Sequence, residues 1–227
     1  AWLRFQQLGA GLAVGNRERF LRELDRDEQR TKARRAKARA KYPDWHNAPV
    51  MPFGPADAGL LIVGLAPGLQ GANRTGRPFT GDYAGDLLYA TLLEFGLARG
   101  TYDRRPDDGL ELVDCRISNA VKCVPPENKP TPEEIRICNR FLKSELAALP
   151  KVKVVLALGL IAHDAVLVGS GLKKSAAKFG HGARHDLPRG RVLFDSYHCS
   201  RYNTNTNRLT PAMFRDVVGK AKAALAR

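Results

Sequence analysis

Residues 64–85 carry the residue types best suited to chemistry in this chain. The stretch reads GLAPGLQGANRTGRPFTGDYAG, with six glycines, two aromatic residues and a single acid, Asp82. Glycines at this density let a backbone pass close to a ligand and point its amide groups inward. A lone carboxylate in such a loop is a candidate for acid–base work, although an aspartate that only stabilises a turn or a helix start fits the same position.

Two more polar stretches hold candidate residues. Residues 122–130 read KCVPPENKP and contain Asn128, and residues 196–210 read SYHCSRYNTNTNRLT and contain His198. Asn119 lies near the end of the apolar segment that leads into the first of them. Amide and imidazole groups can hydrogen-bond a polar ligand. We expect surface or packing roles for the remaining histidines, which have no motif around them: His46, His163, His181 and His185.

The elements that must position these residues alternate along the chain. Short apolar runs predict strands at residues 60–63, 113–121, 152–158 and 191–195, and other patterns predict helices at 85–96, 131–149, 160–168 and from 210 onward. Thr131, Pro132 and Glu134 form a clear helix start. Residues 171–190 are basic and are predicted to be irregular. The alternation predicts an α/β fold, with a mostly parallel sheet whose strand ends bring the three polar stretches to one edge.

Composition and charge indicate one globular domain with an anionic partner. The chain has 227 residues, of which 44% are hydrophobic and 26% charged, and this suits a single α/β domain. The net charge of +14 favours nucleic acid as the partner, although charge alone also fits a basic protein without one. We expect a basic helical segment with a proline-rich connection in residues 1–55, followed by the globular body in residues 56–227.

The N-terminal part of the sequence shows no membrane or export signal. No apolar run approaches the roughly 20 residues that cross a bilayer, and the first residues lack a signal-peptide pattern. We therefore expect a cytoplasmic protein. Residues 30–41 read RTKARRAKARAK, with seven basic residues and no acid, and predict a helix that is either solvated or lies along a DNA backbone.

Common nucleotide-binding motifs do not match the glycine-rich stretch. A P-loop needs Gly-Lys-Ser/Thr at the helix start, where this chain has Gly85-Asp86-Leu87. A dinucleotide fingerprint needs GxGxxG, which GLAPGLQG does not supply. Phosphate groups could still contact this stretch, but through neither motif.

Four segments occur in a characteristic order: GLAPG, NRTGRPFTGD, AVKCVPPENKPTPEE and HCSRYNTNTNRLT. Together they resemble the uracil-DNA glycosylase superfamily, most closely the family-5 (B-type) enzymes of bacteria and archaea, from about residue 53 to the end. The resemblance implies a three-layer α-β-α sandwich around a four-stranded, mainly parallel sheet, with residues 56–227 as the catalytic domain. It also implies a monofunctional DNA glycosylase that flips uracil out of DNA, hydrolyses the N-glycosidic bond and leaves an abasic site for base excision repair.

The resemblance assigns roles to the candidate residues. Asp82 matches an aspartate that activates water or stabilises the sugar cation, Asn128 an asparagine that helps to hold the water, and His198 a histidine that donates to the base oxygen. Six residues are expected to bind the base: Gly64, Leu65, Ala66 and Gly68 through their backbone, Phe79 by stacking and Asn119 through its amide. A core phenylalanine, a strand-end or turn asparagine and a packed or solvated histidine are the simpler alternatives.

The resemblance also predicts a DNA-contacting surface. Ser200 and Arg201 lead a loop that in relatives enters the minor groove. We expect DNA contacts from seven polar residues, for which ordinary loop roles are the alternative: Arg74, Ser200, Arg201, Asn203, Thr204, Thr206 and Arg208. The acid that other families carry in the first motif is absent, which suggests either weaker action on normal uracil or reliance on Asp82, together with a broader choice of bases, such as hypoxanthine or xanthine.

The cysteines depart from the family pattern. Family 4 and 5 enzymes typically hold a [4Fe–4S] cluster on four cysteines, and such a cluster as a rule needs four thiolates. Cys123 and Cys138 match the second pair, but no cysteine precedes Cys115. No CxxC or CxxH pair supports a zinc site either. We therefore expect no cluster, no metal site and no other cofactor.

Two other functions fit parts of the sequence. A non-catalytic DNA-binding relative would keep the charge and the loops, with the missing cysteines as a mark of decay. A nucleotide- or phosphate-handling α/β enzyme is less well supported, because no phosphate motif matches. For the glycosylase, the resemblance implies a monomer that releases free uracil and is associated with the nucleoid through DNA.

Overall fold

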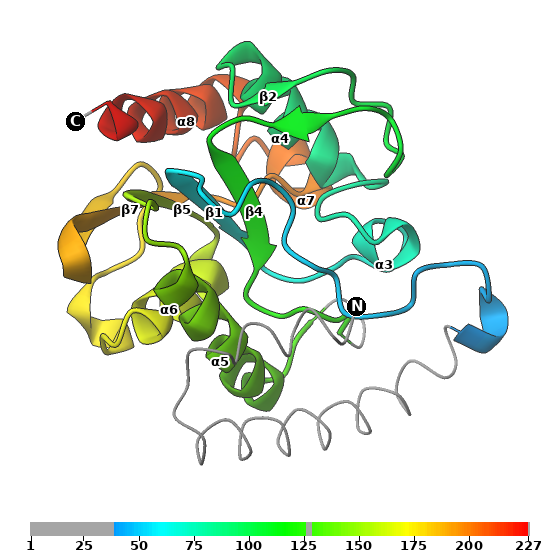
Figure 1. The fold of residues 1–227 in the computed structure, drawn as a ribbon, viewed down its shortest axis with the longest axis horizontal. Coiled ribbons are helices and arrows are strands. Elements are labelled where there is room, and N and C mark those ends of the chain that lie inside the picture. The colour runs from blue at the N-terminus through cyan, green and yellow to red at the C-terminus, as the bar shows by residue number, and fades with distance from the viewer. Residues whose placement is uncertain (1–38, 126–128, 227) are drawn as a thin grey trace.

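A five-stranded sheet forms the middle layer of the computed structural model, which describes residues 39–125 and 129–226 (Figure 1). Asn128 and residues 30–38 of the basic segment lie outside the described residues. The sheet order is β4 (Cys115–Asn119), β1 (Leu60–Gly64), β5 (Val154–Leu158), β7 (Arg191–Ser196) and β6 (Arg184–Leu187). The first four strands are parallel, which confirms the predicted sheet.

Strand β6 is the one addition to the predicted sheet. It pairs antiparallel with β7 at the edge and lies in the segment predicted to be irregular. Its sequence, Arg-His-Asp-Leu, has one buried residue, so it shows neither an apolar run nor a clear alternation. An edge strand held mainly by backbone pairing leaves little signal in sequence.

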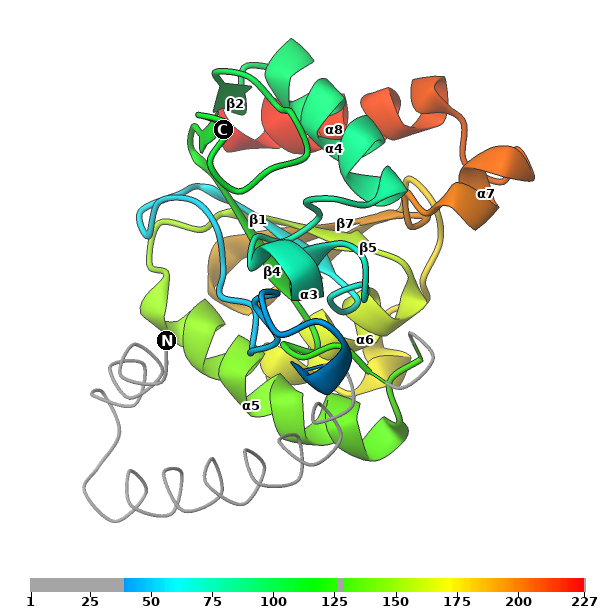
Figure 2. The ribbon, with the colours of Figure 1, turned by 90° about the vertical axis from the view of Figure 1, so that its right-hand side faces the viewer.

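Helices cover both faces of the sheet (Figure 2). Leu60 and Ile62 of β1 share a core with helices α4 (Tyr83–Glu94) and α8 (Pro211–Leu225). Leu61 and Val63 belong to a second core with helices α5 (Pro132–Ala148) and α6 (Leu160–Gly169). All four strand residues are fully buried, and each contributes about 1.5–3 kcal/mol by leaving water. The alternation of β1 side chains therefore produces the three layers.

Local signals explain where several elements begin. Thr131 and Glu134 form the predicted capping box at the start of α5, and Thr210 caps α8. The predicted strand at 113–121 is shorter, because Asp114 has a positive φ of 49° and turns the chain before β4. Residues before this turn form β3 (Glu111–Leu112), which pairs with β2 (Ala98–Arg99) in a separate ribbon.

Two of the polar stretches contain short helices that the sequence did not predict. Helix α3 (Ala72–Thr75) lies in the glycine-rich stretch, and α7 (Arg201–Asn205) lies after His198. Both are too short to show a helical period. Single-turn 3-10 helices also occur at Lys174–Ala176 and Pro188–Gly190. Within the described part of the chain, no helix has the length and apolar character needed to cross a membrane.

Candidate active site

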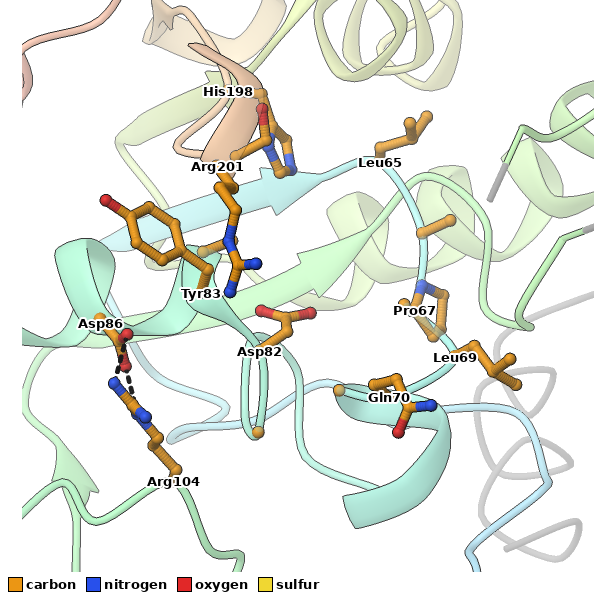
Figure 3. Close-up of a pocket in the computed structure, with 16 residues that line it drawn as sticks. Leu65, Pro67, Leu69, Gln70, Asp82, Tyr83, Asp86, Arg104, His198 and Arg201 are labelled. Atoms are coloured by element: carbon orange, nitrogen blue, oxygen red, sulfur yellow. Dashed lines mark hydrogen bonds and ion pairs between the residues drawn. The ribbon is translucent and has the colours of Figure 1, made fainter. Parts of the chain in front are cut away.

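A cavity of about 790 Å³ opens at the carboxyl edge of the parallel strands (Figure 3). Its walls come from residues 65–71, residues 81–84, Asp86, Arg104, and the start of the last polar stretch, with His198, Ser200 and Arg201. The predicted residues Leu65, Ala66 and Gly68 are therefore part of the wall. The volume is in the range of small-molecule sites.

Asp82 lies at the N-terminus of helix α4 and points its carboxylate into this cavity (Figure 3). It occupies the N-cap position, but its side chain makes no capping hydrogen bond. Its Oδ1 atom is buried and has no hydrogen-bond partner among the described residues. Burial raises the pKa of Asp82, and the nearby N–H groups of Gly85 and Ala84 partly offset this by lowering it. A carboxylate so placed is a ready proton acceptor for a water molecule.

Phe79 is held in an unusual backbone conformation. Its φ of 52° is in the left-handed region, which a bulky residue rarely adopts. The hydroxyl of Tyr102 donates to the Phe79 carbonyl at 3.1 Å, and the hydroxyl of Tyr89 donates to the Pro78 carbonyl at 2.6 Å. A Cβ on Gly85 would overlap the Phe79 carbonyl. Three neighbours thus hold the ring where it lies.

The Phe79 ring lies against the ends of two adjacent strands. Gly64 and Asn119 are paired at the carboxyl ends of β1 and β4. A Cβ on Gly64 would come within 2.5 Å of both Asn119 Oδ1 and the Phe79 ring, so only glycine permits this approach. Asn119 Oδ1 is buried without a hydrogen-bond partner in the described residues. A buried acceptor left unpaired is costly, and it is suited to a donor on a ligand.

His198 lies between the cavity and the Phe79 ring. It lines the cavity, and its ring centroid lies 5.8 Å from that of Phe79. Burial lowers the pKa of His198 to about 4, so the imidazole is neutral near pH 7. Asn203 donates from its side chain to the His198 carbonyl at 2.8 Å and fixes the backbone there. A neutral imidazole can donate one hydrogen bond to a developing anion.

Phe79 and Asn119 are more enclosed than the sequence suggested. Only 7% of Phe79 and 3% of Asn119 are exposed, and neither belongs to the cavity wall. Phe79 is also part of the core against β1. Phe79 therefore occupies a core position, and its ring is stacked with that of His198, which lines the cavity.

A buried ion pair stabilises the turn that carries Phe79. Arg77 forms a two-pronged salt bridge with Asp108, with both N–O distances at 2.8 Å, and donates to Thr80 Oγ1 at 2.7 Å. Burial raises the pKa of Asp108, but the Arg77 hydrogen bonds and the N–H groups of Asp103 and Leu110 outweigh it, and the net shift is downward. The pair ties residues 103–110 to the Phe79 turn.

The predicted DNA-contacting residues fall into two groups. Arg74, Arg201 and Arg208 are exposed, and in Figure 3 the Arg201 guanidinium extends toward Asp82. Arg201 and Arg208 lie over the Tyr83 and Tyr197 rings, at 5.3 and 4.7 Å from the centroids.

The other predicted contacts organise helix α7. Ser200 is its N-cap and accepts from Asn203 N, while Thr204 and Thr206 donate their hydroxyls to carbonyls of the preceding turn. Their side chains therefore have an evident structural role, in addition to the one predicted.

The described cysteines do not fit a four-thiolate cluster. Cys115 lies in the hydrophobic core on β4, and Cys199 is buried beside His198. Burial raises the pKa of both thiols, which opposes the thiolate form that iron needs. Only Cys123 and Cys138 are partly accessible, and the sequence has no cysteine before Cys115.

Sequence reasoning missed the contribution of residues 100–110. Tyr102, Arg104 and Asp108 reach the Phe79 turn or the cavity wall, and Arg104 forms a salt bridge with Asp86 at 2.8 Å. The stretch reads GTYDRRPDDGL, and its pattern predicts only a loop. Its acids and arginines beside one tyrosine were the available signal, but their partners are 18 to 31 residues away in sequence.

Comparisons with known proteins agree with this geometry. The profile of the Uracil DNA glycosylase superfamily matches residues 51–222. A Type-5 uracil-DNA glycosylase of Thermus thermophilus is 52% identical over 174 residues, covering 77% of this chain and 79% of that protein. One from Pyrobaculum aerophilum is 41% identical over 185 residues, 81% and 80% of the two chains. A Type-4 uracil-DNA glycosylase of Thermotoga maritima is 33% identical over 172 residues, 75% and 79%. The chain thus belongs to the uracil-DNA glycosylase superfamily.

Proposed function

We propose that this protein removes uracil from DNA by hydrolysing the N-glycosidic bond and releases free uracil and an abasic site. The observation that carries the proposal is Asp82, whose buried Oδ1 has no hydrogen-bond partner in the described part of the chain, on a cavity that the neutral His198 also lines. The family and the Type-5 names of its relatives support the same activity. The proposed substrate is duplex DNA, from which the base must be flipped to reach the cavity.

The arrangement suggests how the bond breaks. As the bond from the sugar to the base nitrogen opens, the electron pair leaves with the base and positive charge develops on the sugar. His198 donates a hydrogen bond to the base oxygen, where negative charge develops. Asp82 accepts a proton from the attacking water, whose oxygen bonds to the sugar carbon. We assign to Asn119 the recognition of the uracil edge, through its unpaired Oδ1.

The remaining site assignments follow from position. Leu65, Ala66 and Gly68 form part of the cavity wall together with Asp82, and Phe79 supports the base from the side of His198. Asn128 stays a prediction as a water-holding residue. Arg74, Arg201 and Arg208 are proposed to contact DNA phosphates. The cavity volume leaves room for larger bases, such as hypoxanthine or xanthine.

Cleavage assays test the proposal directly. Duplexes carrying U·G, U·A, hypoxanthine or xanthine are incubated with the protein, and abasic sites are revealed by alkali. We expect cleavage at uracil and a loss of about 10²–10⁴-fold for Asp82→Asn. DNA binding without cleavage of any of these duplexes would instead identify a non-catalytic relative. Undiminished cleavage by the Asp82→Asn variant would remove the role given to Asp82.

We also propose that the activity needs no iron–sulfur cluster or other cofactor. The sequence has no cysteine before Cys115, and both Cys115 and Cys199 are buried. Iron and acid-labile sulfide are measured in protein purified without oxygen. A stoichiometric content of four iron atoms per chain would contradict the proposal. We further expect a monomer that acts on DNA in the cytoplasm or nucleoid. Sedimentation of the protein with and without DNA tests its oligomeric state.

A further inference from the structure

Two histidines and one aspartate converge outside the proposed active site. His163 comes from α6, His185 from β6 and Asp195 from β7, and their ligand atoms all lie within 4.8 Å of one another. The side chains of His163 and Asp195 are 1% and 0% exposed, and that of His185 is 16% exposed. None of the three lines the cavity that holds Asp82.

The hydrogen bonds of His163 determine which nitrogen carries its proton. Nε2 lies 3.1 Å from the carbonyl of Ala177, which can only accept, so Nε2 must donate. In neutral imidazole the lone pair is then on Nδ1, which lies 2.8 Å from Asp195 Oδ1. A lone pair and a carboxylate repel each other at this distance. With its lone pair facing this carboxylate, Nδ1 is placed to bind a metal ion together with Asp195.

The donor set and its surroundings favour a metal ion as one occupant. His185 Nε2 lies 2.9 Å from the other oxygen of Asp195, so two imidazoles and one carboxylate surround the same point. Such a set is typical of zinc and related ions, with one position left for water. The bond from His163 to the Ala177 carbonyl is the outer-shell contact that usually orients a metal-bound histidine.

We infer that His163, His185 and Asp195 form a binding site for one divalent transition-metal ion of the zinc class. Their N–O separations of 2.8 and 2.9 Å are those of hydrogen bonds. Zinc bonds of about 2.0–2.2 Å need these atoms to separate by a few tenths of an ångström. When the ion binds, any proton held between His163 Nδ1 and Asp195 Oδ1 leaves to solvent.

The site would fix the segment that carries His198. Asp195 stands three residues before His198 on β7, and its Oδ2 accepts from Gly180 N at 3.3 Å. A metal ion there joins α6, the edge strand β6 and β7 at one point. The partly exposed His185 gives the ion its path from solvent. The role is structural, because no ligand of the site belongs to the cavity wall.

Metal content and optical spectra of the wild-type protein provide the first test. The protein is stripped with a chelator, incubated with zinc or cobalt(II) at about pH 7.5, desalted and analysed by mass spectrometry. We expect one ion per chain, a cobalt spectrum without thiolate charge-transfer bands, and a melting temperature raised by about 5–10 °C at a hundredfold excess over Kd. No retained ion, or a thiolate spectrum from Cys123 and Cys138, overturns the inference.

Matched variants locate the ion. His185→Gln removes the most accessible ligand, and we expect at least a tenfold weaker affinity and, at the same zinc concentration, a thermal shift of at most about half that of the wild type. His46→Gln makes the same change at a histidine outside the cluster, and Cys123→Ser removes the competing thiol; both should retain the ion. Circular dichroism confirms that His185→Gln is folded. Full retention of zinc by folded His185→Gln would contradict the site, independently of any glycosylase activity.

Discussion

The left-handed turn at Phe79 should depend on the phenol of Tyr102. The hydroxyl donates to the Phe79 carbonyl at 3.1 Å, and burial raises the pKa of Tyr102 to about 12, so it remains a donor at neutral pH. The Tyr102→Phe variant keeps the ring and removes the hydroxyl, and with it this bond and the interaction with the Gly81 N–H. It therefore asks whether the bond holds the Phe79 ring beside His198.

The magnitude follows from two opposing terms. A non-glycine residue in the left-handed region costs about 1–2 kcal/mol. The hydroxyls of Tyr102 and Tyr89 contribute about 1 kcal/mol each, so together they roughly balance that cost. Without one of them, the turn relaxes in a large fraction of molecules. We expect kcat/KM for uracil excision to fall about 3- to 10-fold, since about 1.4 kcal/mol corresponds to tenfold.

The assay is single-turnover cleavage of a U·G duplex, with urea unfolding in parallel. A loss of about 1 kcal/mol leaves a protein of ordinary stability folded, so a fall in rate would report the geometry of the site. Tyr89→Phe is the matched variant, because it removes the bond to the neighbouring Pro78 carbonyl, and a similar effect is expected. If Tyr102→Phe lowers stability but leaves kcat/KM within twofold, the bond does not position Phe79.

Four other predictions follow from the site. Asp82→Asn should raise the free energy of unfolding at pH 7 while removing activity. The pKa of Asp82 is raised in the folded protein, so the wild type loses stability as the pH rises through that pKa. The extra stability of the variant should therefore shrink as the pH is lowered toward 4, as measured by urea unfolding. Asp82 accepts a proton only when it is ionised, and burial raises its pKa, so kcat/KM should fall on the acid side at a higher pH than a free aspartate would give, as a pH–rate profile would show. Gly85→Ala should cost more activity than Tyr102→Phe, since the added methyl meets the Phe79 carbonyl; equal rates would contradict this. The affinity for undamaged duplex should fall steeply with salt in filter binding, and Arg201→Ala should reduce that slope by about one.

The parallel sheet could be predicted because its strands are buried on both faces. Leu60–Gly64 and Val154–Leu158 are continuous apolar runs, and the strong capping box at Thr131 marks the following helix. Edge strand β6 and helix α7 gave no comparable signal, since one is mostly polar and the other has a single turn. Patterns in sequence report burial, and these two elements bury little.

In the site as well, local motifs predicted some residues, whereas contacts between segments far apart in the sequence could not be predicted. The motifs placed Asp82 and His198 in stretches that the parallel topology brings to one edge, and both line the cavity. The positive φ of Phe79, however, depends on Tyr102 and on the Arg77–Asp108 pair, which join segments 23 and 31 residues apart. No local pattern encodes such a contact. The histidine cluster was missed for this reason as well, because His163, His185 and Asp195 come from three separate elements.

The position of the Asp82 carboxylate explains why the neighbouring loop needs glycine at residues 68 and 71. A half-buried carboxylate with one oxygen that has no partner among the residues described is unfavourable for folding, yet a hydrogen bond to that oxygen would weaken it as a base. Gly68 and Gly71 keep their backbone close to the carboxylate without a side chain, because a Cβ on Gly68 would come within 3.0 Å of Asp82 Oδ2. Either glycine changed to alanine should therefore displace Asp82 and reduce cleavage, while the fold, which is held by the sheet and its two helical layers, remains intact. Alanine at residue 68 with full activity would show that the carboxylate can move without loss, and that its exposure to water matters more than its position.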